Sequence, residues 1–253
     1  MKSELYFLYV LPYGQMSLWG FIVMPQMLFL FFFISSLSMH SSNKITKLKG
    51  MYRIGPHNKD VLSIIFGSLL GDGHAEKRKS GTGTRITFYQ EHSHVEFLFF
   101  LHKLLSNWGY CSPKEPTIGT RLGIGGKVRK TVRFGTWTYT SFNWIHELWY
   151  VNGVKIIPYC ISDYLTPLAL AVWIMDDGAK VSKGLKFCTN SYTYSDCIIL
   201  IEALYKNFQI KSTIQKSGAD DQYIIYVWKE SMPILREIVG PYIIPEMKYK
   251  VEI

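Results

Sequence analysis

Two apolar, helix-length stretches of the chain end in the same way. The first is LSIIFGSLLGDGHAEK (residues 62–77), and the second is LTPLALAVWIMDDGAK (residues 165–180). Small residues lie among large apolar ones in each, and each reaches an Asp-Gly pair. A single copy is typical of a buried helix that ends at a glycine. Two copies in one chain predict two equivalent helices that bring two carboxylates, Asp72 and Asp177, to one place.

Glycine and alanine in these stretches predict that the two helices pack closely. Residues four apart lie on one helix face, so Gly67 and Gly71 align on the first helix. Small residues there let two backbones approach each other. Gly73 and Gly178, which follow the acids, suit the left-handed turn that ends many helices.

Two carboxylates at the negative ends of two facing helices repel each other unless they share a cation. Mg²⁺ prefers carboxylate, water and phosphate oxygens and keeps much of its hydration. Two such carboxylates against a basic surface would make a site for phosphodiester hydrolysis. A lone Asp-Gly is more often an ordinary turn, but the matched pair favours function.

Charge and cysteine content narrow the class of protein. The chain has 253 residues and a net charge of +9, with Lys and Arg outnumbering Asp and Glu by 28 to 19. This surplus fits a nucleic-acid partner and fits a solvated surface equally well. The four cysteines form no Cys-x-x-Cys pair and have no histidines at zinc-finger spacing. They predict reduced thiols and therefore a reducing compartment.

The first 50 residues differ in composition from the rest of the chain. Residues 5–43 contain no Asp, Glu, Lys or Arg, and residues 18–37 are long enough to cross a bilayer. One interpretation is a leader or anchor that contacts a membrane. The other is a segment translated from an upstream reading frame and fused to an unrelated protein. The composition changes abruptly at residues 42–50 under both interpretations.

Hydrophobic periodicity after residue 54 predicts the same order of elements twice. The first set comprises helix 61–70, strand 85–90, helix 95–108, strands within 121–133 and 134–139, and helix 141–151. The second set comprises helix 166–176, a polar loop, strand 185–189, helix 195–207, strands 211–216 and 222–228, and helix 232–239. The sequence thus predicts an α+β fold of two pseudo-symmetric α-β-β-α-β-β-α halves, residues 51–160 and 161–253, after the extension at residues 1–50.

The motif cores IFGSLLGDG (residues 65–73) and LAVWIMDDG (residues 170–178) resemble those of the LAGLIDADG homing endonucleases and related group I intron maturases. The first core lacks the family's opening Leu-Ala, whereas the second resembles the second motif of single-chain members. The resemblance implies a monomer with pseudo-twofold symmetry. Its motif helices would pair at the centre, and two curved antiparallel sheets would form a saddle in the DNA major groove.

The resemblance also implies roles for particular residues. Asp72 and Asp177 would bind the divalent metal, Mg²⁺, and act as catalytic acids, one for each scissile strand. Lys155 and Lys250 match lysines near the active centre of the family, although either position also fits a phosphate contact or a plain surface lysine.

The resemblance extends to polar positions behind the acids. Gln90 and Asn190 correspond to family residues that arrange the water network. Asp176 aligns with Gly71 of the other half, which makes it a support for Asp177 rather than its equal. The candidate DNA-binding residues on strands and loops are Lys77, Arg78, Arg85, Arg121, Lys127, Arg129, Arg133, Lys183, Lys186, Lys211 and Lys216.

Three functional hypotheses follow. The first is a site-specific endonuclease that cuts double-stranded DNA at the intron-less allele and promotes homing of its own intron. The second is a maturase that binds the host intron RNA and assists its splicing, alone or in addition to cleavage; retention of both acids favours cleavage. The third is a membrane protein with a soluble tail, which leaves the repeated motif unexplained. The resemblance to organellar intron-encoded members implies a mitochondrial location, with the chloroplast as the alternative.

Overall fold

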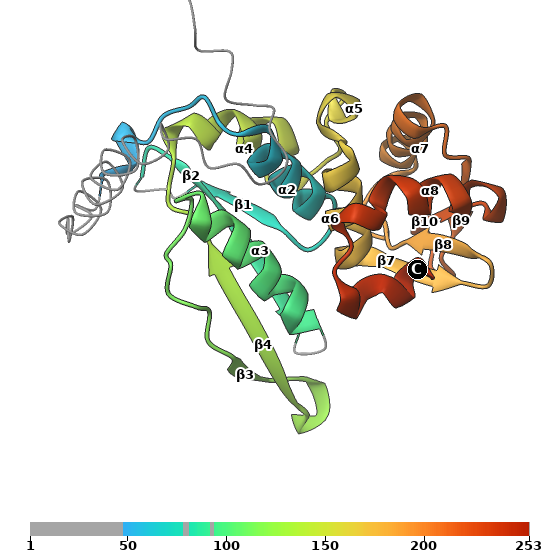
Figure 1. The fold of residues 1–253 in the computed structure, drawn as a ribbon, viewed down its shortest axis with the longest axis horizontal. Coiled ribbons are helices and arrows are strands. Elements are labelled where there is room, and N and C mark those ends of the chain that lie inside the picture. Colours follow the sequence, from blue (N-terminus) through green and yellow to red (C-terminus); the bar gives the residue numbers. More distant parts are fainter. Residues whose placement is uncertain (1–47, 78–80, 92–93, 253) are drawn as a thin grey trace, which may run out of the picture. The chain divides into compact units, whose positions relative to one another are not determined.

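A computed structural model of the chain describes residues 48–77, 81–91 and 94–252. Within them, no helix is long and apolar enough to cross a membrane. The membrane-length stretch predicted at residues 18–37 lies outside the described residues. Leu48–Ile253 make up one compact unit, and its elements are labelled in Figure 1.

Two apolar helices pack against each other at the centre of this unit, α2 (Lys59–Leu70) and α6 (Pro167–Asp177). Each begins at a side chain that accepts a backbone N–H: Asn58 accepts from Asp60, and Thr166 accepts from Ala169. The helices touch through the predicted small residues. A Cβ atom on Gly67 would overlap the carbonyl oxygen of Ala169 and lie 2.9 Å from Cβ of Val172.

The first sheet follows α2 and has the strand order β1-β2-β4-β3, with antiparallel pairing throughout. Its strands are β1 (His74–Lys77), β2 (Thr84–Glu91), β3 (Gly119–Leu122) and β4 (Val128–Gly135). Two helices, α3 (Val95–Asn107) and α4 (Asn143–Trp149), contact it, and α3 lies along β4 in Figure 1. The alternation of buried and half-buried residues along β2 shows that one face of the sheet covers the core.

The second sheet follows α6 and repeats this order as β7-β8-β10-β9. Its strands are β7 (Gly178–Val181), β8 (Gly184–Phe187), β9 (Ser212–Lys216) and β10 (Tyr223–Val227). Helix α7 (Tyr194–Phe208) packs on β9 and β10, and α8 (Met232–Val239) packs on α6. The predicted α+β fold with two matching halves is therefore confirmed.

Short elements connect and end the halves. The hairpin of β5 (Tyr150–Val151) and β6 (Val154–Lys155) and the helix α5 (Ile161–Tyr164) lead from the first half into α6. A 3-10 helix, Pro245–Lys250, follows α8. Both segments matter for the site because each carries one of the predicted lysines.

Of the local predictions, one was incomplete and two were wrong. The strands β1 and β7, directly after the motifs, belong to the predicted α-β-β-α-β-β-α pattern but were given no residue range, because strands of four residues carry little periodic signal. The predicted boundary between strands 121–133 and 134–139 is displaced, because Gly125 and Gly126 make a turn between β3 and β4. Gly73 and Gly178 do not adopt left-handed conformations. They are needed because a Cβ atom at either position would lie within 2.6 Å of a carbonyl oxygen in its own helix.

Candidate catalytic centre and nucleic-acid interface

Two lysines bind the C-terminal ends of the two central helices. Nζ of Lys155 donates to the carbonyl oxygens of Gly71 and Gly73, both at 2.9 Å. Nζ of Lys250 donates to the carbonyl oxygen of Met175 at 2.6 Å, with Ile174 and Asp176 at 3.3 Å. A cation at this end satisfies unpaired carbonyls and offsets the negative end of the helix dipole. Both predicted lysines therefore lie beside the acids, and Lys250 is buried rather than a surface residue.

The buried carboxylate of Asp176 joins the two helix ends. It accepts the backbone N–H of Asp72 at 2.8 Å and a hydrogen bond from the side-chain amide of Gln90. The space it occupies exists because Gly71 has no side chain, since a Cβ atom there would overlap the Asp176 carboxylate. Burial raises the pKa of Asp176 well above its usual range, and the nearby charges of Asp177 and Asp72 raise it further.

Asp72 and Asp177 are the more accessible acids of the cluster, with Asp72 exposed and Asp177 half-buried. Burial and then the charge of Asp72 raise the pKa of Asp177 to about 7, against the opposing effect of Lys155 and Lys250. The two carboxylates are thus electrostatically coupled, as expected for acids at two adjoining helix ends.

The lysines are perturbed in turn. Burial lowers the pKa of Lys155 to about 8, while the charges of Asp176, Asp177 and Asp72 act in the opposite direction. Burial also lowers the pKa of Lys250. Acids with raised and bases with lowered pKa values in one place are characteristic of functional sites.

The sheet registers show which residue of the second half is equivalent to Gln90, and it is not the expected one. His74 and Ala179 each follow an Asp-Gly pair, and in the ladders His74 lies opposite Thr87 and Ala179 opposite Lys186. Thr87 therefore corresponds to Lys186, and three residues further along Gln90 corresponds to Thr189, not to Asn190. Gln90 and Thr189 are both buried, whereas Asn190 is exposed, as is Glu91 at the matching position. The sequence alignment of Gln90 with Asn190 is therefore wrong by one residue, enough to turn a side chain to the opposite face of a strand.

Two further residues reach the cluster without having been predicted. The hydroxyl of Tyr192 donates to the carbonyl oxygens of Leu69 and Leu70, at 3.1 and 3.3 Å, so the second half caps the helix of the first. Nδ1 of His94 lies 3.3 Å from Oε1 of Gln90. Neither residue belongs to a repeated motif, so the sequence held no signal for them.

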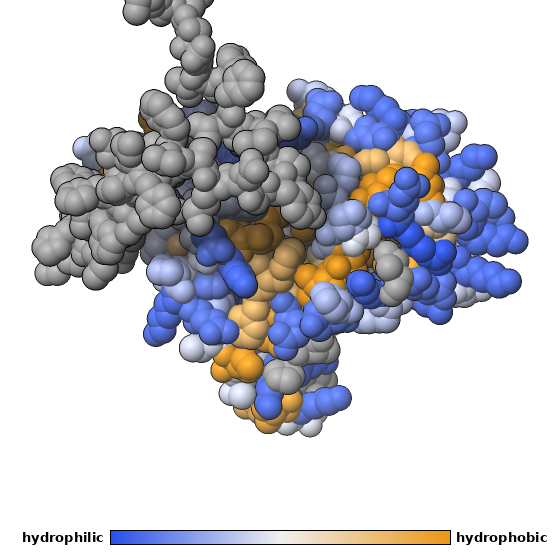
Figure 2. Space-filling model, viewed as in Figure 1, coloured by the Kyte–Doolittle hydropathy of each residue, from blue (hydrophilic) through white to orange (hydrophobic). Residues whose placement is uncertain are grey.

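The outward face of the first sheet carries a set of arginines. Along β2, Arg85, Thr87 and Tyr89 alternate with the buried Ile86 and Phe88. In the ladders, Tyr89 lies opposite Arg133, and Arg121 opposite Arg129, so these arginines share that face. Hydrophobic side chains appear at the end of the β3–β4 hairpin in Figure 2, where Leu122 and Val128 are exposed.

The predicted DNA-binding residues fall into four groups. On the outward sheet faces lie Arg85, Arg121, Arg129, Arg133 and Lys186, and in or beside strand connections lie Lys127, Lys183 and Lys211. Lys77 and Lys216 have the register of core-facing residues, and Lys77 donates to Glu147 of α4 at 3.0 Å. Arg78 lies outside the described residues. Lys77 and Lys216 are thus the two that the register turns away from the outward face of their own sheets.

Residues 62–235 match the sequence model of the LAGLIDADG DNA endonuclease family. The chain belongs to this family. It is 56% identical over 204 residues to the cytochrome b mRNA maturase bI2 of Saccharomyces cerevisiae, covering 78% of this chain and 48% of that protein. It is 52% identical over 195 residues to the maturase of the same name from Debaryomyces hansenii, covering 77% and 74%. The chain thus spans about half the length of the yeast relative.

A solved structure of similar fold is that of the homing endonuclease I-WcaI bound to its DNA recognition sequence. The two superpose with a TM-score of 0.68 at 27% sequence identity, over 77% of this chain and 86% of the other. Helices α2 and α6 contain most of the two motif cores and are the LAGLIDADG helices of this chain; residues 71–73 of the first core and Gly178 of the second follow the helices.

The LAGLIDADG helix ends offer few protein ligands for a metal ion. No cluster of three or more His, Cys, Asp or Glu side chains that could hold a metal occurs among the described residues. The available donors are the carboxylates of Asp72 and Asp177. Magnesium often binds through one or two carboxylates together with water and substrate phosphates, so this sparse, oxygen-only set fits Mg²⁺ at a nucleic-acid substrate.

Proposed function

We propose that the protein is a site-specific endonuclease that hydrolyses both strands of double-stranded DNA with the help of a divalent metal ion. Its target is the intron-less allele, and cleavage promotes homing of its own group I intron. The observation that carries the proposal is the pair of coupled carboxylates, Asp72 and Asp177, at the ends of two packed helices. The half-buried Lys155, the buried Lys250 and an arginine-bearing sheet lie in the same unit.

In this proposal Asp72 and Asp177 hold Mg²⁺, which when bound activates water and stabilises the leaving oxygen. Two of the three ammonium protons of Lys155 are donated to the carbonyl oxygens of Gly71 and Gly73. The third would be donated to a phosphate oxygen of the substrate. Asp176 fixes the backbone of Asp72, and Gln90 fixes Asp176. Lys250 holds the end of α6 and thereby places Asp177.

The two halves, residues 51–160 and 161–253, would act together as a monomer on one DNA duplex. Their outward sheet faces would enter the major groove, where strands can reach base edges and lysine and arginine side chains can bind phosphates. The similarity to I-WcaI, solved on its DNA recognition sequence, supports this mode of binding.

A maturase activity on the host intron RNA is the second candidate. It rests on two relatives at 56% and 52% identity, both named as cytochrome b mRNA maturases. The chain could carry both activities, because the acids that cleavage would need are present. The cytochrome b in these names also supports a mitochondrial location, whereas these relatives give the chloroplast alternative no support.

A plasmid-cleavage assay tests the endonuclease. The full chain with Mg²⁺ is expected to linearise a plasmid that carries the joined exons of the intron insertion site. Asp72→Asn and Asp177→Asn should each abolish cleavage while binding persists, since each removes a metal ligand but leaves the sheets intact. Asp163→Asn, in the short helix α5, is the matched control and should cut normally.

A wild-type chain that binds this site yet never cuts with Mg²⁺ or Mn²⁺ would contradict the endonuclease and favour the maturase. Stimulation of intron splicing by the Asp177→Asn variant would then measure the RNA activity separately. If the same variant loses both activities, the two depend on one site.

A further inference from the structure

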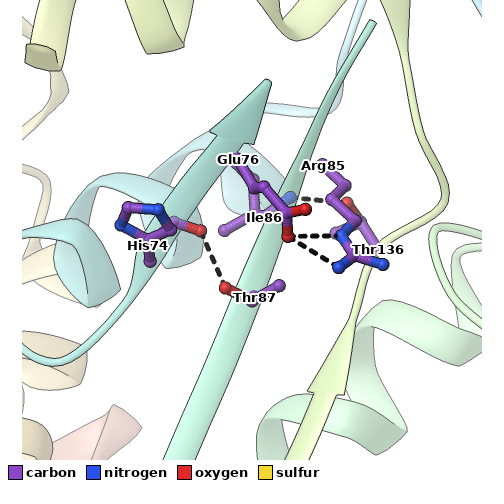
Figure 3. Close-up of polar contacts among 6 residues, drawn as sticks. All are labelled: His74, Glu76, Arg85, Ile86, Thr87 and Thr136. Carbon is purple, nitrogen blue, oxygen red and sulfur yellow. Dashed lines mark hydrogen bonds and ion pairs between the residues drawn. The ribbon is translucent and has the colours of Figure 1, made fainter. Parts of the chain in front are cut away.

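An arginine on the outward face of the first sheet is held by a carboxylate on the neighbouring strand (Figure 3). Nε and Nη2 of Arg85 both donate to Oε2 of Glu76, at 2.8 and 2.6 Å. The two residues lie directly opposite each other in the β1–β2 ladder. Their side chains are 32% and 35% exposed, so the pair is accessible but not free to move like a surface lysine.

Further hydrogen bonds hold the two residues that follow Arg85, Ile86 and Thr87, to chain segments on both sides of β2. The backbone N–H of Ile86 donates to Oγ1 of Thr136 at 3.0 Å, and the Thr136 N–H returns a bond to the Ile86 carbonyl at 2.9 Å. Oγ1 of Thr87 donates to the carbonyl oxygen of His74 at 3.1 Å, which ties β2 back to β1. The backbone that carries the guanidinium therefore has a defined position.

The guanidinium keeps one hydrogen-bonding edge for a ligand. Arginine has five N–H donors in a planar fork, and Glu76 takes the Nε–Nη2 edge, leaving the Nη1–Nη2 edge. The pair lines a hollow of about 390 Å³ together with Tyr89 and Arg133. Gly135, opposite Thr87, keeps this hollow open because it brings no side chain to the face.

A carboxylate at this place argues against a simple phosphate contact. Glu76 neutralises the arginine beside it, which weakens attraction to a phosphate backbone. It also holds the fork in one orientation, which favours recognition of a planar pair of acceptors. Guanine presents such a pair, N7 and O6, in the major groove.

We propose that Arg85 reads a guanine base in the major groove of the target DNA and that Glu76 is the positioning residue that aims it. The proposal rests on the endonuclease function and names one base contact within it. Arg85 would donate from the Nη1–Nη2 edge to O6 and N7 while Glu76 keeps the other edge.

A binding selection from a random-sequence DNA duplex library, with the full chain, tests the pair. The wild-type chain should select a consensus that contains a guanine lost in Arg85→Ala, with a preference over other bases of roughly tenfold to a hundredfold. Arg85→Lys should lose the same guanine although it keeps the charge, because lysine has no fork. Glu76→Ala should bind random DNA more tightly and prefer that guanine less. A merely electrostatic role of Glu76 would change affinity but not base preference.

The Lys77–Glu147 ion pair supplies the matched control. Nζ of Lys77 lies 3.0 Å from Oε1 of Glu147, a distance similar to those in the Arg85–Glu76 pair. Lys77 follows Glu76 on β1 and therefore lies on the opposite face of the sheet. Lys77→Ala should leave every base preference unchanged. If Arg85→Ala and Arg85→Lys leave the consensus intact, or if the lost base is not guanine, the base contact is refuted. A wild-type chain that selects no consensus refutes the proposed function itself.

Discussion

The two halves of the molecule share a strand order but carry different surfaces. In the first, β2 and β4 are eight residues long, and four arginines lie on the outward face: Arg85, Arg121, Arg129 and Arg133. In the second, the strands are four or five residues long. Its outward positions include Lys186, Thr213, Gln215 and Tyr226. The repeat has kept the paired helices while the sheets have diverged in length and charge.

The helix ends differ in a complementary way. The first helix has Gly71 where the second has Asp176, and the carboxylate of Asp176 fills the space that Gly71 leaves. A side chain at both positions would overlap, so only one half can carry this acid. The centre is therefore asymmetric in its packing although each half presents one acid, Asp72 or Asp177, and one lysine.

The largest expected effect comes from the helix contact that the halves share. Gly67→Ala should lower the free energy of unfolding by about 3 kcal/mol, because the new Cβ would overlap backbone of α6 and the helices would have to separate. Chemical denaturation measures this loss. Gly119→Ala, in the exposed strand β3 with no atom closer than 3.8 Å to its new Cβ, should change stability by less than about 0.5 kcal/mol. Equal effects at the two glycines would refute close packing as the cause.

The second prediction tests the asymmetry at Gly71. Gly71→Ala should cost about 2 kcal/mol, because the added methyl group displaces the buried carboxylate of Asp176. In an Asp176→Ala background the same change should cost less than about 1 kcal/mol, since the carboxylate is gone. A double-mutant cycle measures this coupling. If the two costs are the same, Asp176 does not depend on the missing side chain.

The third prediction concerns the pH dependence of the acid in the second half. The folded-state pKa of Asp177 is raised to about 7 from 3.8, so its favourable contribution is complete below pH 3.8 and is lost as the pH rises through 7. Without divalent metal, Asp177→Asn should therefore be more stable than wild type at pH 8, because it removes a carboxylate whose ionised form is unfavourable in the folded state. The expected gain is only about 1.5 kcal/mol, because water screens part of the repulsion. The gain should vanish near pH 4.

Denaturation curves across this pH range check the third prediction. Asp163→Asn is the matched control for the substitution, because Asp163 lies in α5 outside the acid cluster. Added Mg²⁺ should reverse the order at pH 8 if it binds the folded wild-type chain, since a ligand of the native state stabilises it. An Asn variant that is less stable than wild type at pH 8 without metal would contradict the raised pKa.

The smallest expected effects compare single basic residues of the two sheets. Arg133→Ala should weaken DNA binding. It should also reduce the slope of the logarithm of the binding constant against the logarithm of the salt concentration by about 1, the amount expected for one lost phosphate contact. Lys216→Ala should change neither, because its register turns it towards the side of β9 that α7 covers. Binding titrations at several salt concentrations measure both. Equal losses would show that the two sheets contribute alike despite their different faces.

The sequence was sufficient for the central features of the fold. The paired apolar stretches, their small residues and the Asp-Gly ends predicted α2 and α6, and the repeated element order predicted two sheets of one design. These signals are local or repeat within the chain, so they can be read without knowing the contacts. The strands β1 and β7 belong to the predicted pattern, but their residues could not be assigned because four residues are too few to show alternation.

The arrangement of the candidate site was predicted only in part. Sequence matching placed Lys155 and Lys250 near the acids, but it did not predict that each would bind carbonyl oxygens at the end of a LAGLIDADG helix. It aligned Gln90 with Asn190, whereas the strand register aligns Gln90 with Thr189. Tyr192 was missed because its partners, Leu69 and Leu70, lie in the other half of the chain.

The sequence by itself determined which chemical groups end the two helices: Asp72 and Asp177, each followed by glycine. The tertiary structure alone decided that Asp176 fills the space beside Gly71 and that Glu76 holds Arg85. It also decided that Lys77 and Lys216 have the register of the core-facing side of their sheets. The physical reason is that a one-residue change in register reverses the face of every side chain on a strand, and that register is fixed by contacts between distant parts of the chain.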